Sequence, residues 1–399
     1  MMPKGNLFEV GIVGAGTAGL ATAIALARAG HAVTVFEKHR ALAPLGAGIL
    51  IQPQGIAALD ALGVGAAFRA ASVPVTRLLG TSHRDWIIVD IDYGAGEARG
   101  VSRTALAQLL LDAALALGVR VAYGHPVERV VVHGARAAIV TPHNDKRFDL
   151  AVIADGAAST LPAQVGLAVA STVYKWGALW AMFDVEDWAG QALLEQRYHA
   201  TRKMYGLMPT ARVGSKLRLS MFWSLPCSAY GAWQARPIED WKAELLALWP
   251  ASRPVVEQIV RHDQFALATY HHARARRLAS GPVCVIGDAA HAMSPQLGLG
   301  STLAVQDALA LATALQGGGA IDGAARYSDE RLCAVRNYQR FSKALTPCFQ
   351  ADTGGLWRDL LFATGLKLPG IAQLMYRSIA AGPQAKKIPA PAVEALRGE

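Results

Sequence analysis

The feature that most constrains the fold is a glycine-rich turn between an apolar run and an alanine-rich segment near the N-terminus. Residues 8–13 are apolar, and a G-x-G-x-x-G turn occupies residues 14–19. Residues 20–29 have the composition of a helix, and residues 31–36 return to a strand-like composition that ends on Glu37. This order predicts a βαβ unit in which the glycine turn opens the helix.

Each part of this unit has a role in binding a dinucleotide. Gly14 permits the tight turn, Gly16 lets a pyrophosphate approach the backbone, and Gly19 allows close contact between helix and sheet. The helix N-terminus adds free N–H groups and the positive end of its dipole. Glu37 can accept hydrogen bonds from the adenosine ribose, with Lys38 beside it as a further contact. The motif predicts a dinucleotide site without separating FAD from NAD.

Polar residues also follow two later apolar segments. Asp155 comes after residues 148–154, and Asp288 comes after residues 282–287, and we expect both segments to be buried strands. An acid directly after a buried strand must face polar groups at the carboxyl edge of the sheet. Arg103, at the start of an expected helix over residues 103–117, is placed to pair with cofactor phosphates or a ribityl chain.

The composition changes in the middle of the chain, where tryptophan and tyrosine become frequent between residues 168 and 276. Strand-like runs such as residues 217–223 predict a mostly antiparallel sheet there, completed by residues 76–93. Its aromatic lining suits a flat ligand. Helices are expected over residues 301–315 and 326–345.

Two further motifs, taken with the N-terminal turn, carry a family resemblance. Residues 152–159 (Val-Ile-Ala-Asp-Gly-Ala-Ala-Ser) resemble the central Asp-Gly motif of the class A flavoprotein monooxygenases, typified by para-hydroxybenzoate and salicylate hydroxylases. Residues 287–300, which begin Gly-Asp-Ala-Ala-His, resemble the third FAD motif of that family. The resemblance covers most of residues 8–315 and implies FAD as the cofactor. With the N-terminal turn, it assigns the cofactor contacts to Gly14, Gly16, Gly19, Glu37, Lys38, Gly48, Arg103, Asp155, Asp288, Pro295, Gly298, Gly300 and Ser301.

The resemblance also implies how the flavin is held. Asp288 would bind a ribityl hydroxyl, and the loop from Pro295 to Gly300 would run beside the isoalloxazine and form a wall of the substrate pocket. The helix beginning near Ser301 would point its positive end at the flavin, which favours the negative charge of the reduced ring by roughly 0.3–2 kcal/mol. His291 is typical of the family as a structural residue.

The implied fold is α/β, with a Rossmann-like FAD-binding domain interleaved with a mostly antiparallel substrate domain and followed by C-terminal helices. The FAD-binding domain is expected in three parts, residues 1–75, 101–167 and 277–345. The substrate domain takes residues 76–100 and 168–276, and residues 346–399 form a C-terminal helical segment.

The implied reaction is hydroxylation of a small aromatic or N-heteroaromatic substrate. In the family, NADH or NADPH reduces the flavin, dioxygen adds at C4a, and the resulting hydroperoxide transfers one oxygen atom. An epoxidase, halogenase or oxidase of the same fold is the alternative, although the W-x-W-x-I-P signature of halogenases is absent. An NAD-dependent dehydrogenase would share only the first motif.

A phenolic substrate is activated by losing a proton, so a histidine or tyrosine is expected near its ring. We assign the catalytic positions to Tyr205 and His272, with Tyr270 examined beside them and Pro295 as the flavin-side wall. The other candidates in the substrate region are His83, Tyr198, His199, Tyr230 and His271.

Composition limits the partners. The four cysteines have neither a zinc spacing nor a disulfide pattern, so no metal site is expected. The net charge of +9 suits anionic ligands, but the basic cluster of residues 271–277 lacks aromatic interleaving and predicts no nucleic-acid binding. With no apolar run of about 18 residues and no signal peptide, a cytoplasmic protein without membrane contact is expected. Its partners would be a small-molecule substrate and dioxygen, and its state a monomer or homodimer.

Overall fold

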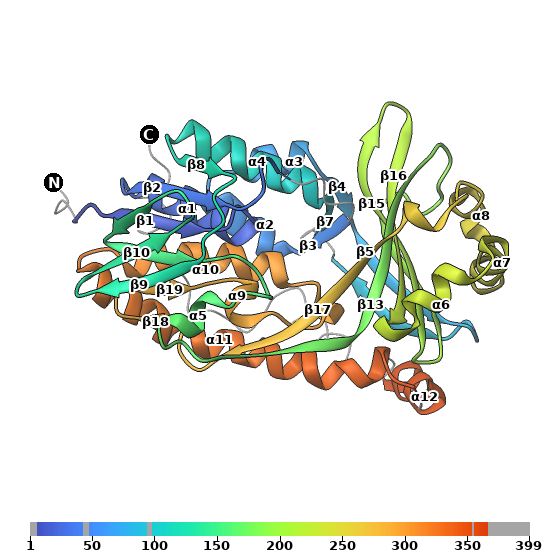
Figure 1. The fold of residues 1–399 in the computed structure, drawn as a ribbon. Coiled ribbons are helices and arrows are strands. Elements are labelled where there is room, and N and C mark those ends of the chain that lie inside the picture. The colour runs from blue at the N-terminus through green and yellow to red at the C-terminus, as the bar shows by residue number, and fades with distance from the viewer. Residues whose placement is uncertain (1–5, 43–47, 94–97, 353–354, 366–399) are drawn as a thin grey trace.

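The computed structural model describes residues 6–42, 48–93, 98–352 and 355–365. Two lobes share the chain, one built on a parallel sheet and one on a mostly antiparallel sheet (Figure 1). The parallel sheet has six strands, and only the pair at its β18 edge is antiparallel. Its order is β18 (Ala279–Ser280), β19 (Val283–Val285), β12 (Leu150–Ile153), β1 (Glu9–Val13), β2 (Ala32–Glu37) and β8 (Arg120–Tyr123).

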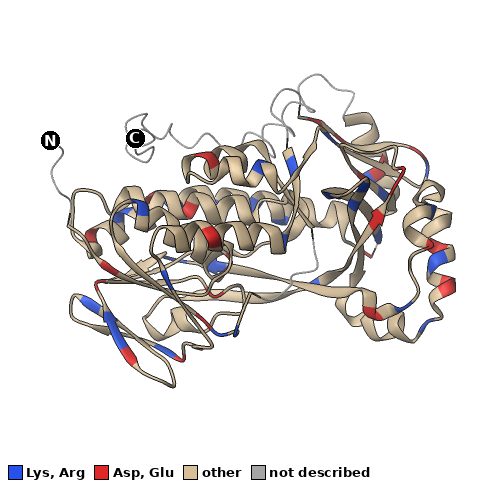
Figure 2. Ribbon diagram, turned by 90° about the horizontal axis from the view of Figure 1, so that it is seen from above, with Lys and Arg blue, Asp and Glu red and all other residues tan. Residues whose placement is uncertain are grey.

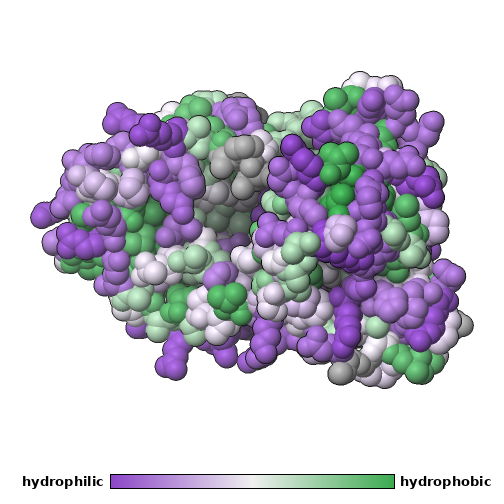
Figure 3. Space-filling view, turned by 45° about the vertical axis from the view of Figure 1, so that its right-hand side comes forward, coloured by the Kyte–Doolittle hydropathy of each residue, from purple (hydrophilic) through white to green (hydrophobic). Residues whose placement is uncertain are grey.

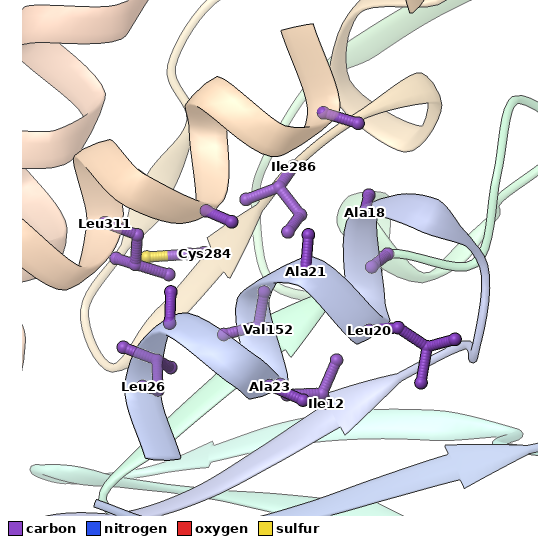
Figure 4. Packing of buried hydrophobic residues seen from close by; sticks show 14 of the residues in the cluster. Ile12, Ala18, Leu20, Ala21, Ala23, Leu26, Val152, Cys284, Ile286 and Leu311 are labelled. Atoms are coloured by element: carbon purple, nitrogen blue, oxygen red, sulfur yellow. The ribbon is translucent and has the colours of Figure 1, made fainter. Parts of the chain in front are cut away.

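Helix α1 (Thr17–Arg28) packs between this sheet and helix α10 (Gly300–Ala314). Figure 4 shows Ala21 of this helix pointing towards Ile286 and Ala23 lying beside Ile12 of β1. Small side chains let the two helices approach closely, which explains the alanine-rich composition. The expected βαβ unit is confirmed, and Cys284 is a buried free thiol.

A second, three-stranded sheet lies on the other face of β1. Its strands are β9 (Arg129–His133), β10 (Arg136–Val140) and β11 (Asp145–Phe148). A Cβ on Gly11 would lie only 2.5 Å from Ile139 and 2.6 Å from Phe148, so the glycine lets this layer pack tightly. The single strand expected over residues 148–154 is therefore wrong at its start, because Phe148 belongs to β11 and only the later residues form β12.

The second lobe is built on a seven-stranded sheet in which only β14 and β5 pair in parallel. The contribution expected from residues 76–93 is confirmed, since β5 and β6 form one edge. The order is β17 (Ala266–Ala275), β13 (Val169–Val185), β16 (Lys216–Pro226), β15 (Lys203–Val213), β14 (Leu193–His199), β5 (Arg77–Ser82) and β6 (Ile87–Asp92).

The two faces of this sheet have different partners, because successive side chains of a strand point to opposite faces. One face packs against helices α7 (Ile238–Leu248) and α8 (Arg253–Val256) around Trp241 and Trp223. The other face carries Phe222 and Trp180 and packs towards Leu297 of the first lobe. The second face is therefore the one that meets the flavin motifs.

The remaining elements cover and join the lobes, and a small sheet of β3 (Gly48–Ile51), β7 (Ala98–Ser102) and β4 (Val73–Val75) lies between them. The helices expected over residues 103–117, 301–315 and 326–345 are confirmed, the last inside a longer helix. The other helices are α2 (Pro53–Ala61), α3 (Gly65–Ala70), α4 (Arg103–Ala116), α5 (Leu161–Gln164), α6 (Tyr230–Ala235), α9 (Asp288–His291), α11 (Ala320–Phe349) and α12 (Gly355–Gly365), with 3₁₀ turns η1 (Cys227–Ala229), η2 (Pro250–Ser252), η3 (His262–Gln264) and η4 (Pro295–Leu297).

None of the helices within these described ranges has both the length and the apolar composition that crossing a bilayer requires.

The core on the helix-covered face of the sheet should contribute strongly to the stability of the fold. Trp241 is 1% exposed at the centre of this core, so Trp241→Ala should lower the free energy of unfolding by about 3–5 kcal/mol. Trp357 is 49% exposed, and Trp357→Ala should change the free energy of unfolding by no more than about 0.5 kcal/mol. Urea unfolding of both variants measures the difference, and equal losses would contradict this account of the core.

Candidate cofactor and substrate site

Four of the predicted cofactor residues lie at one edge of the parallel sheet. Gly14 follows β1, Glu37 ends β2, Asp155 follows β12, and Asp288 follows β19. These four strands run parallel, so their carboxyl ends lie at the same edge. Ligands of open α/β sheets bind at this edge, and the sequence motifs therefore converge on one place.

The three glycines of the N-terminal turn have distinct roles. Gly14 has a φ of +99°, a conformation that favours glycine, and a Cβ there would lie 2.6 Å from the carbonyl oxygen of Ala154. A Cβ on Gly19 would lie 1.9 Å from the carbonyl oxygen of Gly14. A Cβ on Gly16 would meet nothing within 4 Å. Two glycines thus allow close packing, and the third leaves open space beside the N-terminus of α1.

Glu37 connects the end of β2 to this turn. Its carboxylate accepts hydrogen bonds from the backbone N–H groups of Ala15, at 2.9 Å, and His39, at 2.9 Å. A carboxylate can accept about four hydrogen bonds, so capacity remains for ribose hydroxyls. Lys38 is exposed and close enough to Asp155 to lower the pKa of that carboxyl, against the larger opposing effect of burial.

The third motif is held by a buried carboxylate that sequence reasoning missed. Asp307, on α10, is fully buried and accepts hydrogen bonds from the backbone N–H of Gly287 at 3.0 Å and the Nε of Arg331 at 2.9 Å. Oδ2, the oxygen that accepts from Gly287, also lies 2.5 Å from Nε2 of His291, whereas Arg331 donates to Oδ1. Burial alone would raise the pKa of Asp307, but the neighbouring His291 and Arg331 lower it to about 2. One ionised group thus joins α9, α10 and α11.

This network fixes where α9 begins. Gly287 has a φ of +59°, and a Cβ there would lie 2.6 Å from Cβ of Ala18 on α1. Asp288 is the first residue of α9 and is exposed, although the residues on either side of it are buried. The backbone just before Asp288 therefore packs against the first turn of α1.

The loop from Pro295 to Gly300 lies next to Asp288. An ideal Cβ on Gly300 would lie 3.9 Å from Oδ1 of Asp288, and Gly298 adopts a left-handed φ of +62°. Both glycines are exposed. Leu297, which precedes them, is buried in the second lobe's apolar cluster. Ser301 follows in the first turn of α10.

Two buried polar atoms near this loop have no hydrogen-bond partner. Gln52 donates through Nε2 to the carbonyl of Leu297 at 2.8 Å, but its Oε1 is unpaired. Oγ1 of Thr302 is also buried and unpaired. Buried acceptors are normally satisfied, so these atoms fit a site that a polar ligand completes. With the open space at Gly16 and the exposed carboxylate of Asp288, the residues present fit a flavin dinucleotide.

Gly48 has a packing role. A Cβ there would lie 2.5 Å from Cγ2 of Thr210 and 2.6 Å from Cβ of Ser220, whose Oγ accepts a hydrogen bond from the Gly48 N–H. This contact joins β3 to the antiparallel sheet. Residues 43–47, which precede Gly48, lie outside the described residues.

Arg103 and Tyr270 bring the two lobes together at the site. Arg103 is exposed at the first turn of α4, whose N-cap Ser102 accepts a hydrogen bond from the N–H of Ala105. Its charge is close enough to lower the pKa of Tyr270, although burial, the larger effect, raises it. Tyr270 in turn accepts a hydrogen bond from Nε1 of Trp180 at 3.3 Å.

The other predicted catalytic residues lie apart. Tyr205 is 0% exposed and packs among tryptophans on the helix-covered face of the sheet, so the structure does not bring it to the flavin motifs. Burial also raises its pKa. Tyr198 is buried beneath Arg358, and His83 stacks on His199 with ring centroids 4.4 Å apart.

His272 lies near the loop from Pro295 to Gly300, which we call the flavin loop after its expected role. Its ring meets that of Tyr174 edge-on at 5.1 Å, and burial, followed by Lys343, lowers its pKa. Tyr174 donates a hydrogen bond to Gln350 at 2.6 Å, and burial raises its pKa to about 12. Gln296 of the loop donates to Gln350 as well. His272 therefore contacts the loop through intermediate side chains.

In the space-filling view of Figure 3, the surface is hollowed between the two lobes. Within the part of the chain that the structure describes, no group of three or more His, Cys, Asp or Glu side chains is arranged to hold a metal ion. The site combines glycine turns, single carboxylates and an aromatic sheet face.

Comparison with known proteins identifies this combination. A family model described as FAD binding domain matches residues 8–342, and the chain belongs to the family of FAD-dependent aromatic hydroxylases. It is a flavin-dependent monooxygenase with FAD as its cofactor and, as is typical of the family, NADH or NADPH as co-substrate. The family, the cofactor and the reaction class expected from the motifs are confirmed, and an epoxidase, halogenase or oxidase is not favoured.

Three similar proteins illustrate the relationship. A putative 2-heptyl-3-hydroxy-4(1H)-quinolone synthase of Rhodococcus erythropolis is 30% identical over 324 residues, covering 76% of this chain and 78% of that protein. A FAD-dependent urate hydroxylase of Klebsiella pneumoniae subsp. pneumoniae is 24% identical, covering 82% and 86%. The crystal structure of Klebsiella pneumoniae HpxO complexed with FAD superposes with a TM-score of 0.80 at 21% identity, covering 94% and 99%.

Removing the Glu37 carboxylate tests the adenosine side of the site. Glu37→Ala should weaken FAD retention and also lower stability by about 1–3 kcal/mol, because the buried side of the turn loses an acceptor for the N–H of Ala15. Glu37→Gln keeps an acceptor oxygen and should restore most of the stability but only part of the FAD retention. Flavin absorbance after dialysis is the measurement, and full retention by Glu37→Ala would contradict the assignment.

Neutralising Asp307 tests the network behind the third motif. Asp307→Asn leaves Arg331 buried without its counter-charge and should cost about 3–5 kcal/mol at neutral pH. Because the folded pKa is depressed from 3.8 to about 2, the wild-type carboxylate contributes stability above pH 3.8 that is lost as the pH falls towards 2. Urea unfolding from neutral to acid pH measures this, and a variant with the same acid sensitivity as wild type would contradict the assignment.

Proposed function

We propose that this enzyme hydroxylates a flat, uncharged heteroaromatic substrate held between the flavin loop and the antiparallel sheet. One observation carries the proposal. On the face of β13, β15 and β16 that carries Phe222, the charged side chains lie at the strand ends and are paired, Asp184 with Arg218 at 2.7 Å and Lys216 with Glu186 at 3.5 Å. The central inward positions contain no ionisable side chain, so these positions offer no partner for a charged ring substituent. These positions are Trp180, Met182, Met204, Gly206, Met208, Ser220, Phe222 and Ser224.

Two aromatic rings on this face support a planar ligand. The centroids of Trp180 and Phe222 are 5.2 Å apart. A Cβ on Gly206 would lie 2.0 Å from the Phe222 ring, so the glycine lets that ring lie against the sheet. Met204 and Met208 are flexible side chains that adapt to irregular apolar groups such as an alkyl chain. The relatives named as quinolone synthases support a bicyclic quinolone with an alkyl substituent as the class of substrate.

Tyr270 is our choice for the group that orients the ring. Trp180 donates to its hydroxyl oxygen, which leaves the Tyr270 proton available for a carbonyl or hydroxyl oxygen of the substrate. Burial raises the pKa of Tyr270, so the hydroxyl stays protonated at neutral pH and acts as a donor. With Tyr205 in the opposite core, Tyr270 replaces it in our assignment, while His272 would act only through Tyr174 and the loop.

The FAD would supply oxygen activation after its reduction by NADH or NADPH. We assign its adenosine to Glu37 and Lys38, its pyrophosphate to Gly14, Gly16 and Arg103, and its ribityl chain to Asp288. The loop from Pro295 to Gly300 and the N-terminus of α10 at Ser301 would hold the ring, with Oε1 of Gln52 accepting from a ring N–H. Gly19 and Asp155 would shape the site, and Gly48 would position β3. We further propose a cytoplasmic monomer or homodimer and keep the domain boundaries given above.

A substrate screen tests the proposal. Alkylated quinolones, uncharged hydroxypyridines and indoles should accelerate NAD(P)H oxidation with oxygen uptake, and the quinolones should give the highest ratio of product to NAD(P)H. Phenolic acids are the matched comparison, because their carboxylate finds no partner on this sheet face. Stimulation by the acids alone would overturn the substrate class.

Tyr270→Phe isolates the role of the hydroxyl. It keeps the ring and removes the donor, so kcat/KM for the substrate should fall about tenfold to a hundredfold while FAD content stays at the wild-type level. The product formed per NAD(P)H should also decrease, because a misplaced ring receives oxygen less often. Tyr205→Phe is the control and should leave kcat/KM unchanged. Equal kinetics for Tyr270→Phe and wild type would remove Tyr270 from the site.

A further inference from the structure

A row of positive charges runs along the junction of β17 and α11, outside the site described so far. On β17 and just after it, Arg274 and Arg276 alternate with the buried Ala273 and Ala275, so both point outward. On α11, Arg336, Arg340 and Lys343 have spacings of four and three residues and share one face of the helix. We call these five residues, Arg274, Arg276, Arg336, Arg340 and Lys343, the basic row.

Three contacts align the strand with the helix. Arg336 donates to the carbonyl of Arg276 at 3.2 Å, and Gln339 donates to the carbonyl of Ala273 at 2.5 Å. Lys343 lies close enough to His272 to affect its pKa. Helix positions 336 to 343 thus lie beside strand positions 276 to 272, and each segment spans roughly 10–13 Å. The basic row is an extended feature with the dimensions of a small polyanion.

The basic row lacks counter-charges. No Asp or Glu occurs in residues 169–183, 266–280 or 332–350, and Asp329 and Glu330, nearer the start of α11, form no ion pair with the row. Among the ion pairs between described residues, none includes a member of the row, and Nε of Arg336 is buried with no partner. In the view of Figure 2, by contrast, acidic and basic residues are interspersed on the ribbon. Unneutralised like charges repel one another, so a row of them is stabilised by an anionic ligand.

The inner end of the row leads to the flavin loop. Lys343 neighbours His272, whose ring contacts Tyr174, and Tyr174 lies 3.5 Å from Nε2 of Gln296 in that loop. The reaction requires a dinucleotide electron donor with a pyrophosphate, yet the only G-x-G-x-x-G turn of the chain belongs to the FAD site. A second dinucleotide must therefore bind without a Rossmann turn of its own.

We propose that the basic row binds the pyrophosphate and adenosine end of NADH or NADPH, with the nicotinamide directed towards the flavin loop. Guanidinium groups match the paired oxygens of a pyrophosphate, and several of them in line hold an extended ligand. The inference rests on the proposed function, because it assumes that the enzyme takes electrons from a pyridine nucleotide.

Charge removal on the holoenzyme tests the row. Arg340→Gln/Lys343→Gln should raise the KM for NAD(P)H at least about tenfold, since each charge-assisted contact is worth that factor or more. The kcat at saturating NAD(P)H, the FAD content and the thermal midpoint should stay unchanged. The KM should also depend less steeply on salt than in wild type. Arg340→Lys/Lys343→Arg keeps both charges and should retain a KM near the wild-type value.

A control variant and a nucleotide fragment sharpen the test. Arg253→Gln/Arg261→Gln removes the same charge from exposed sites elsewhere and should change the KM by less than about twofold. ADP-ribose, which lacks the nicotinamide, should compete with NAD(P)H in wild type and lose affinity in the row variant. An unchanged KM in the row variant would overturn the proposal. If the row variant also lost a binding to duplex DNA or to anionic vesicles that wild type shows, while its KM stayed unchanged, the row would instead be assigned to that macromolecule.

Chemical reduction separates this proposal from the proposed function. Dithionite bypasses the nucleotide, so the reduced row variant should hydroxylate its substrate with oxygen in one turnover as wild type does. If neither wild type nor the row variant hydroxylated the substrate after reduction by dithionite, the proposed substrate class would be refuted. The affinity for ADP-ribose would still decide whether the row binds the nucleotide.

Discussion

The carboxylate of Asp307 is the interaction on which the flavin lobe depends. It is fully buried, and a buried charge is tolerated only when it is paired and hydrogen-bonded. Its partners come from the backbone at Gly287, from His291 on α9 and from Arg331 on α11. If these elements did not assemble together with α10, the buried charge would be left unpaired. The Asp307 carboxylate therefore determines where α9 begins and leaves Asp288 exposed.

The second lobe provides what the flavin lobe lacks, a flat apolar surface with one oriented donor. The loop from Pro295 to Gly300 joins the two, since Gln52 binds the carbonyl of Leu297 and the Leu297 side chain enters the second lobe's core. In the proposed site, the substrate would lie between exposed Gly298 and Gly300 on one side and Trp180 with Tyr270 on the other. Our proposal therefore assigns cofactor chemistry and substrate choice to different lobes.

The sequence allowed prediction of residues that directly follow strands. It did not allow prediction of residues whose partners lie on other helices and strands. The glycine turn, Glu37 and Asp288 were predictable because adjacent residues define each of them. Asp307 was missed because it is one polar residue in an apolar helix, and its partners lie 16, 20 and 24 residues away. Nothing local in the sequence signals that these distant side chains meet.

The same limit explains the other differences between the sequence expectations and the structure. Tyr205 was chosen as a ring-facing tyrosine, but the face that a strand residue occupies depends on register, and a shift of one residue reverses it. Phe148 was joined to the following strand because both are apolar, whereas its partner is Gly11 in a different layer. For Gly48, the sequence did not indicate the close packing of β3 on Thr210 and Ser220, and its assignment to the cofactor stays a prediction.

The most direct test of this account is the origin of the oxygen atom in the product. Turnover of an alkylated quinolone with NAD(P)H under isotopically heavy dioxygen, in ordinary water, should place one heavy oxygen atom in the hydroxylated ring, as mass spectrometry would detect. Heavy oxygen found only in hydrogen peroxide, or product oxygen derived from water, would contradict a monooxygenase that binds this substrate between its flavin loop and its aromatic sheet.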